Sequence, residues 1–487
     1  MVTLTDLQAI LPLIILAAGA VGLLTLISFY RNLWVSFFVT GITLVGAFFS
    51  IKFAWDLGRH PIPAMFTVDH LGLVFIGVIL ISAFAVAHFA LDYFRKFDDN
   101  RDEFFVLLLI GTLGGCSLAI SSHFIAFFLG LELMSVPLYA MVAYTLKRDA
   151  SLEAGFKYLI LAAAAAAFLL FGFALIYTET RAMDFSVLAV NLAQLGQFYN
   201  PILVHAGLAM VFGAICFKLS LVPFHWWTPD IYQGAPAPVS AFLSTVSKVG
   251  VVAVFLRFAL DLDLANNPTF LSGVYPVVIL SVLVGNLLAL AQKNLKRLLA
   301  YSSIAHLGYL MITFLISGNI AVEATILYMV TYSLTSLGTF GVLSALSSSE
   351  KEVENLDDVR GLYFQRPFLS IIFTLMMLSL AGIPLTAGFM GKFLVVAAGA
   401  QDLEAMAIPL LTLVAGSAIG LYYYLKVVWT LFQKEPEAIS TAGNRPTISE
   451  FAMFALILVS VLTLFIGIYP TPVTELLRFI ANTYQPF

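Results

Sequence analysis

The sequence predicts an all-α protein that crosses a membrane many times. Of its 487 residues, 61% are hydrophobic and 11% are charged, whereas soluble domains average about 25% charged residues. Apolar runs of about 20 residues, the length that crosses a bilayer as a helix, recur from end to end. The segments between these runs are only long enough for loops, which excludes a soluble domain.

Charge and cysteine content exclude several other classes. The net charge of −4 is spread along the chain and provides no basic surface for nucleic acid. The two cysteines, Cys116 and Cys216, lie in separate apolar runs without partners at metal-ligand spacing, so neither a disulfide framework nor a metal or iron–sulfur site is expected. The first residues, MVTLTDLQAILPL, lack the basic segment of a cleavable signal, and the first apolar run is expected to be a true span.

Fourteen spans result when the apolar runs are separated at charged, Pro-rich and Gly-rich segments. Two runs, 201–232 and 367–399, are too long for one straight helix across about 30 Å of hydrocarbon. They contain Pro223 and Pro384, which remove a backbone donor and break a helix. Both runs are therefore expected to be discontinuous helices that mark a pathway. The expected spans are 9–29, 33–55, 70–94, 103–121, 123–146, 153–178, 201–232, 237–260, 270–292, 297–317, 321–346, 367–399, 403–432 and 449–470.

The distribution of Lys and Arg predicts that both termini lie on the outer, periplasmic side. This orientation leaves fifteen Lys and Arg in cytoplasmic loops and span ends and five on the outer side, as the positive-inside rule requires. The longest polar connection, 347–366, is then cytoplasmic and is either a docking surface or a solvated loop. The cytoplasmic residues are Arg31, Arg95, Lys96, Arg101, Lys147, Arg148, Lys157, Lys293, Lys296, Arg297, Lys351, Arg360, Arg366, Lys434 and Arg445, and the outer ones are Lys52, Arg59, Arg181, Arg257 and Arg478.

The positions of the two broken spans predict an internal repeat. They are the seventh and the twelfth spans, so they run in opposite directions through the membrane, as in inverted-topology repeats. The expected parts are N-terminal spans one to three (1–100), a first repeat (101–262), a second repeat (263–432) and a C-terminal span (433–487).

Four ionisable residues stand deep inside predicted spans, namely Glu132, Lys218, Lys248 and Lys392. At about 1.5 Å per residue, Glu132 and Lys248 lie about 14–15 Å into their spans, near the midplane. A charge in lipid costs roughly 2.5–3.5 kcal/mol and usually marks an ion path, so we interpret the four as a proton relay. The alternative is an ion pair that only holds helices together, which small residues and hydroxyls do at lower cost.

Lysine suits a relay because its proton can be released inside a protein. Desolvation favours the neutral amine and a nearby carboxylate favours the ammonium, so movement of a carboxylate relative to a lysine transfers a proton. Arginine cannot do this, and none of the four positions is Arg. We expect Glu132 and Lys218 to form the switching pair.

Other polar residues are weaker candidates. His306 stands in the hydroxyl-rich run LLAYSSIAHLGYLM, where it either relays protons between Lys248 and Lys392 or is an interior histidine with satisfied hydrogen bonds. Lys426 either leads towards the second broken helix or extends its ammonium to the cytoplasmic surface. His225, beside two tryptophans, is a relay residue or part of an interfacial aromatic belt.

Three motifs resemble the antiporter-like membrane subunits of respiratory complex I, and the resemblance covers nearly the whole chain. The segment TPDIYQGAPAPV is similar to the N-type subunit, whereas L-type and M-type relatives carry an LPDAHVEAPTPVS-like version. The chain also stops shortly after the last span, unlike the L-type subunit. The motifs are FKLSLVPFHWWTPDIYQGAPAPVSAFLSTVSK, NLKRLLAYSSIAHLGYL and GIPLTAGFMGKF.

The resemblance implies a fourteen-span fold with two inverted repeats and a non-redox subunit of a proton-translocating NADH:quinone oxidoreductase. It implies relay roles for Glu132, Lys218, Lys248 and Lys392, which are all N-type residues. It implies that NADH, FMN, iron–sulfur clusters and quinone are bound by other subunits, with the membrane-arm and peripheral-arm subunits and the lipid bilayer as partners and no nucleic acid. The expected location is a bacterial inner membrane. The alternatives are a subunit of a multisubunit cation/proton antiporter and a static scaffold.

Overall fold

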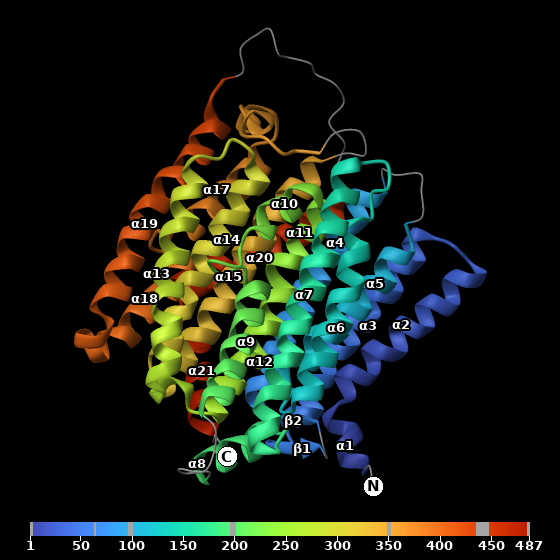
Figure 1. Ribbon diagram of the computed structural model, residues 1–487. Helices are drawn as coiled ribbons and strands as arrows, with labels where there is room; N and C mark the ends of the chain where they lie inside the picture. The colour runs from blue at the N-terminus through green and yellow to red at the C-terminus, as the bar shows by residue number, and fades with distance from the viewer. Residues whose placement is uncertain are drawn as a thin grey trace.

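The computed structural model describes residues 3–62, 65–95, 101–194, 201–347, 352–434 and 448–484. Long helices run side by side as one bundle (Figure 1). The strands in the described part are β1 (His60–Ile62) and β2 (Phe66–Val68), which form a short antiparallel hairpin. A helical bundle satisfies every backbone hydrogen bond within each span, as hydrocarbon surroundings require.

Helix boundaries follow the predicted spans within a few residues. Short polar residues begin several helices: Asn32, Asp69 and Asn294 each accept a hydrogen bond from a backbone N–H of the first turn. The unbroken helices are α1 (Leu4–Ala9), α2 (Leu11–Phe29), α3 (Leu33–Trp55), α4 (His70–Phe94), α5 (Glu103–Ala119), α6 (Phe124–Val142), α7 (Asp149–Thr180), α8 (Phe185–Gln194), α13 (Pro268–Leu290), α14 (Leu295–Met311), α15 (Asn319–Leu346), α16 (Leu362–Gln365), α19 (Leu403–Phe432), α20 (Glu450–Ile468) and α21 (Thr471–Thr483).

Twelve segments of the described chain are long and apolar enough to cross a membrane. Two shorter apolar helices, α5 and α17 (Pro367–Ala381), lie among them. The protein is therefore a multi-pass membrane protein, and the expected count of fourteen spans stays a prediction.

Both predicted helix breaks are present. Helix α9 (Pro201–Leu219) ends before Pro223, and the chain resumes as α10 (Trp227–Gly234). Helix α17 ends before Pro384, and the chain continues as α18 (Ala387–Gly399). Proline lacks the backbone donor that an inner helical turn needs, which weakens a helix at that point. Helices α6, α13 and α19 nevertheless continue through Pro137, Pro276 and Pro409, so proline alone does not explain the two breaks.

A third irregularity was not predicted. The span expected over 237–260 begins as α11 (Ala237–Phe242), passes through a π-helical turn (Leu243–Ser247) and continues as α12 (Lys248–Asp261). Single π-helical turns are rare and frequent at functional sites. This one ends directly before Lys248.

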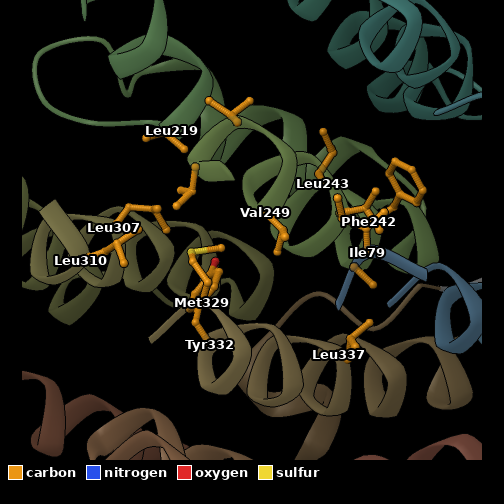
Figure 2. Close-up of a cluster of buried hydrophobic side chains, with 14 of the residues drawn as sticks. Ile79, Leu219, Phe242, Leu243, Val249, Leu307, Leu310, Met329, Tyr332 and Leu337 are labelled. Carbon is orange, nitrogen blue, oxygen red and sulfur yellow. The ribbon is translucent and has the colours of Figure 1, made fainter. Parts of the chain in front are cut away.

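The centre of the bundle is formed by α11, α12, α14 and α15. The most apolar stretches of segments 237–261 and 295–315 are entirely buried. In α2 and α7, only a third of the corresponding stretch is buried. Figure 2 shows side chains of α12, α14 and α15 packed together, among them Val249, Leu307 and Met329. A helix buried all round occupies the protein core, and one with a broad exposed apolar face contacts lipid.

Helices α1 and α21 lie at the same end of the bundle (Figure 1). This agrees with the prediction that both termini are on one side of the membrane, although it does not identify that side. Three residues used in the orientation prediction, Lys96, Lys351 and Arg445, lie outside the described residues.

Candidate functional site

Lys218 is buried near the C-terminal end of α9, with 3% of the residue exposed. Its Nζ donates a hydrogen bond to Ser135 Oγ at 2.7 Å and lies 5.7 Å from the centre of the Tyr158 ring, whose face attracts a cation. Ser135 stands one turn of α6 beyond Glu132. The Glu132 carboxylate acts on Lys218 electrostatically, and its Oε1 is buried with no hydrogen-bond partner among the described residues. The expected pair is therefore close, while Ser135 is the group that contacts the ammonium.

Lys248 is bound at the first helix break. Its Nζ donates to the carbonyl of Leu219 at 3.0 Å and to Ser220 Oγ at 2.8 Å. Leu219 is the last residue of α9, so its carbonyl lacks an intrahelical donor and is free to accept. The ammonium is held by a carbonyl and a hydroxyl, without a contacting carboxylate in the described part of the chain.

Lys392 has the same relation to the second break. Its Nζ donates to the carbonyls of Leu380 and Ala381, both at 3.1 Å, and these are the last two residues of α17. The ammonium also lies 5.1 Å from the centre of the Tyr309 ring. Each break thus exposes carbonyls at a half-helix C-terminus, where the helix dipole favours a cation.

His306 lies on α14 within a group of hydroxyls. Its Nδ1 is 2.8 Å from the Tyr328 hydroxyl and its Nε2 is 3.1 Å from the Tyr424 hydroxyl. Hydroxyls both donate and accept, so these hydrogen bonds can reverse direction when a proton passes. Lys392 acts on the imidazole electrostatically. We call the surrounding hydroxyls the hydroxyl cluster; its members are Ser302, Ser303, Tyr328, Tyr332 and Tyr424.

The structure brings the candidate residues into two groups. Glu132, Lys218 and Lys248 surround the first break, and His306 and Lys392 surround the second. Among the described residues, no hydrogen bond joins Lys248 to His306. Apolar side chains pack where α12, α14 and α15 meet (Figure 2), so a proton needs water or side-chain movement to pass between the groups.

Two weaker candidates are not part of either group. Lys426 is an exposed residue of α19. His225 is 2% exposed, whereas its neighbour Trp226 is 69% exposed. The His225 ring lies 4.6 Å from the ring of Trp226, so the exposed tryptophan covers the histidine, and both interpretations of His225 stay predictions.

Sequence reasoning missed several buried charges near span ends. Arg257 is 1% exposed and donates two hydrogen bonds to Asp69, at 2.6 and 2.7 Å. Lys296 and Glu352 form a second buried ion pair. These residues were read as loop charges because distance along the chain does not reveal what covers a helix end. The sequence pattern that indicates a buried Lys296 is its position on the same face of α14 as Ser303 and His306.

Comparison with known sequences identifies the family. Residues 121–420 match the family described as NADH:quinone oxidoreductase/Mrp antiporter, TM. NADH-quinone oxidoreductase subunit N of Ectopseudomonas mendocina is 43% identical over 485 residues, covering 98% of this chain and 97% of the relative. The protein of the same name from Methylococcus capsulatus is 43% identical over 489 residues, covering 99% and 96%.

Chains of solved membrane complexes also resemble this chain. A chain of respiratory complex I from Thermus thermophilus matches with a TM-score of 0.80 and 35% identity, covering 95% of this chain and 98% of that one. A chain of the Mrp complex from Dietzia matches with a TM-score of 0.83 and 21% identity, covering 99% and 98%, which shows a shared fold alone.

The bundle, its two broken helices and the family match define an antiporter-like membrane subunit. Within this class, the chain belongs to the subunit N family of NADH-quinone oxidoreductases.

Proposed function

We propose that this chain carries protons across the membrane as a subunit of a proton-translocating NADH:quinone oxidoreductase. The relay consists of Glu132, Lys218, Lys248, His306 and Lys392. The observation that carries the proposal is the binding of two buried ammonium groups to the free carbonyls of two broken helices. A purely structural cation would be held more securely by a carboxylate, whereas carbonyls bind an ammonium without preventing release of its proton.

The relay works through changes in the surroundings of each lysine. When the Glu132 carboxylate approaches Lys218, the ammonium is favoured, and when it withdraws, burial favours the amine and a proton leaves. Lys248 receives protons at the first break, and His306 with the hydroxyl cluster passes them to Lys392. Water that enters between α12 and α14 completes the path, and its exclusion interrupts the path.

The presence of one broken helix in each half, α9–α10 and α17–α18, supports two inverted repeats, 101–262 and 263–432, within a fourteen-span fold. We further propose that both termini are periplasmic, on the positive-inside distribution of Lys and Arg. The named relatives belong to NADH-quinone oxidoreductase, so we propose that the other subunits of that complex are the partners and bind its redox cofactors.

The decisive test is Lys218→Ala in the assembled complex. NADH-driven proton transport into membrane vesicles should be abolished or strongly depressed, while native gels show normal assembly. Lys52→Ala is the matched control, because it removes an exposed lysine of α3 that is not a relay candidate and should transport as the parent does. Full proton transport in Lys218→Ala would contradict the relay.

A cation/proton antiporter subunit is distinguished by its partners. Purification in a mild detergent, followed by mass spectrometry, should recover NADH-oxidising and quinone-reducing subunits with this chain. Recovery of antiporter subunits alone would assign the chain to the other class.

A further inference from the structure

Outside the two groups of relay candidates, a further set of buried charges lies at the end of the bundle opposite the termini. Glu352 Oε1 is 2.8 Å from Lys296 Nζ and accepts a hydrogen bond from the backbone N–H of Ala237 at 2.8 Å. Lys296 also donates to the carbonyls of Gln233 and Ala235, at 3.2 and 2.6 Å. The pair therefore sits at the junction of α10 and α11, on the chain segment that leads to Lys248.

Solvent exposure falls stepwise from the surface to this pair. The side chains of Arg148 and Glu354 are 25% and 22% exposed and form an ion pair. Arg148 also pairs with Glu352, whose side chain is 1% exposed. Lys296, the innermost member, is 0% exposed. Water thus reaches Glu354 and Arg148, and two further side chains carry the charge network into the protein.

Beyond Lys296, polar groups continue along one face of α14. Lys296, Ser303 and His306 are spaced at i, i+7 and i+10, which places them on the same side of the helix. Ser303 hydrogen-bonds to Tyr332 at 2.6 Å, and the Tyr332 ring lies 5.7 Å from that of His306. Because Ser303 and Tyr332 are members of the hydroxyl cluster, this face of α14 reaches the cluster at the middle of the helix.

Tyr232 occupies the interval between Lys296 and Ser303. It immediately precedes Gln233, whose carbonyl Lys296 contacts, and its hydroxyl lies within electrostatic reach of Ser303 and Tyr332. Its hydroxyl is buried and has no hydrogen-bond partner within the described ranges. Buried hydroxyls are usually hydrogen-bonded, so an unpaired hydroxyl beside Ser303 is unusual for a group with only a structural role.

We propose that Lys296 and Glu352 form the site at which this chain takes up protons from the cytoplasmic side, and that α14 conducts them to His306 through Tyr232, Ser303 and Tyr332. The proposal rests on the proton-carrying function proposed above. It adds a point of entry for protons at the second group, and we expect transport to require this entry as well as the switching pair of Glu132 and Lys218.

The proton balance of the uptake step is simple. The ammonium of Lys296 gives one proton to the hydroxyl chain and becomes a neutral amine beside the Glu352 carboxylate. A proton from cytoplasmic water reaches Glu352 past Glu354 and passes from its carboxyl group to the amine. This restores the carboxylate and the ammonium, which is the ion pair in the structure.

Lys296→Arg separates this role from a structural one. Arginine keeps the positive charge and the hydrogen-bond donors but does not release a proton. We expect NADH-driven proton transport to fall to the level of Lys218→Ala in the same vesicles, with normal assembly on native gels. A structural ion pair instead predicts transport at the parental level. Arg360→Lys is the matched control, because Arg360 is 38% exposed and pairs with the exposed Asp357 outside this network.

Glu352→Gln provides the second test if the larger arginine prevents assembly. The amide oxygen of glutamine can still accept from the Ala237 N–H, but the side chain cannot carry a proton. The same loss of transport is expected. If either assembled variant transports protons at the parental rate while Lys218→Ala is inactive, the uptake site is overturned and the proposed function is not. Parental transport in Lys218→Ala as well overturns the proposed function.

Discussion

The residues of the candidate relay are distinguished by what holds their charge. Lys248 and Lys392 donate to backbone carbonyls, and Lys218 donates to a serine hydroxyl. Arg257, in contrast, is bound by both oxygens of Asp69. A lysine can release its proton, whereas the guanidinium held by Asp69 is a permanent charge.

Glu132→Gln should leave assembly intact and lower proton transport through the chain by about ten-fold or more, since a positioned proton-transfer group contributes about 10²–10⁴-fold. The physical reason is that glutamine cannot modulate the charge of Lys218. Proton transport and quinone reduction are measured in the same vesicles. A static scaffold predicts the reverse result, impaired assembly with normal transport per assembled complex.

Asp69→Asn should destabilise the protein by about 3–5 kcal/mol, because it removes the carboxylate that binds the buried Arg257. Thermal inactivation of the purified complex measures this loss. Replacing both partners, as Asp69→Leu with Arg257→Met, should recover much of the stability because the buried guanidinium is then removed together with its partner. Equal losses in the single and double variants would show that the pair contributes little.

At the scale of helices, close packing depends on glycines at particular contacts. A Cβ at Gly114 of α5 would fall on the backbone of Met134 in α6. A Cβ at Gly41 of α3 would meet nothing within 4 Å. The two glycines look alike in sequence, and only the neighbouring helix distinguishes them.

Gly114→Ala should therefore destabilise the α5–α6 contact by about 1–3 kcal/mol, the usual cost of overpacking. Gly41→Ala should be neutral or stabilising by about 0.5–1 kcal/mol, since alanine favours a helix over glycine. Assembly yield and inactivation temperature of the two variants give the comparison. Similar behaviour of both would indicate that α5 and α6 move apart readily.

For the whole molecule, the testable property is the topology in the membrane. Thr5 lies at the end of the bundle that carries α1 and α21, and it is exposed. Asp357, with 80% of its side chain exposed, lies in the predicted cytoplasmic connection. Cys116 and Cys216 are buried, so the native thiols should not react with a reagent that cannot cross the membrane.

Such a thiol reagent should label Thr5→Cys from the periplasmic side and Asp357→Cys only after the membrane is opened. The unsubstituted protein is the control and should remain unlabelled. The opposite pattern would reverse the orientation inferred from Lys and Arg.

The sequence by itself determined the class of protein, the positions of the helices, both helix breaks and the buried lysines. These features depend on local properties, namely apolar length, proline chemistry and the cost of a charge in lipid. The resemblance of three motifs also indicated the family, which the comparisons confirmed.

The tertiary structure decided which group each lysine contacts, that His225 is buried, and that Lys296 and Glu352 are buried together. It also revealed the hydroxyl cluster around His306, whose members come from α14, α15 and α19. These facts could not be read from the chain because each depends on residues far apart in sequence. Whether a polar side chain is bound, exposed or unpaired is set by the neighbouring helix, and only the packing of the bundle determines that neighbour.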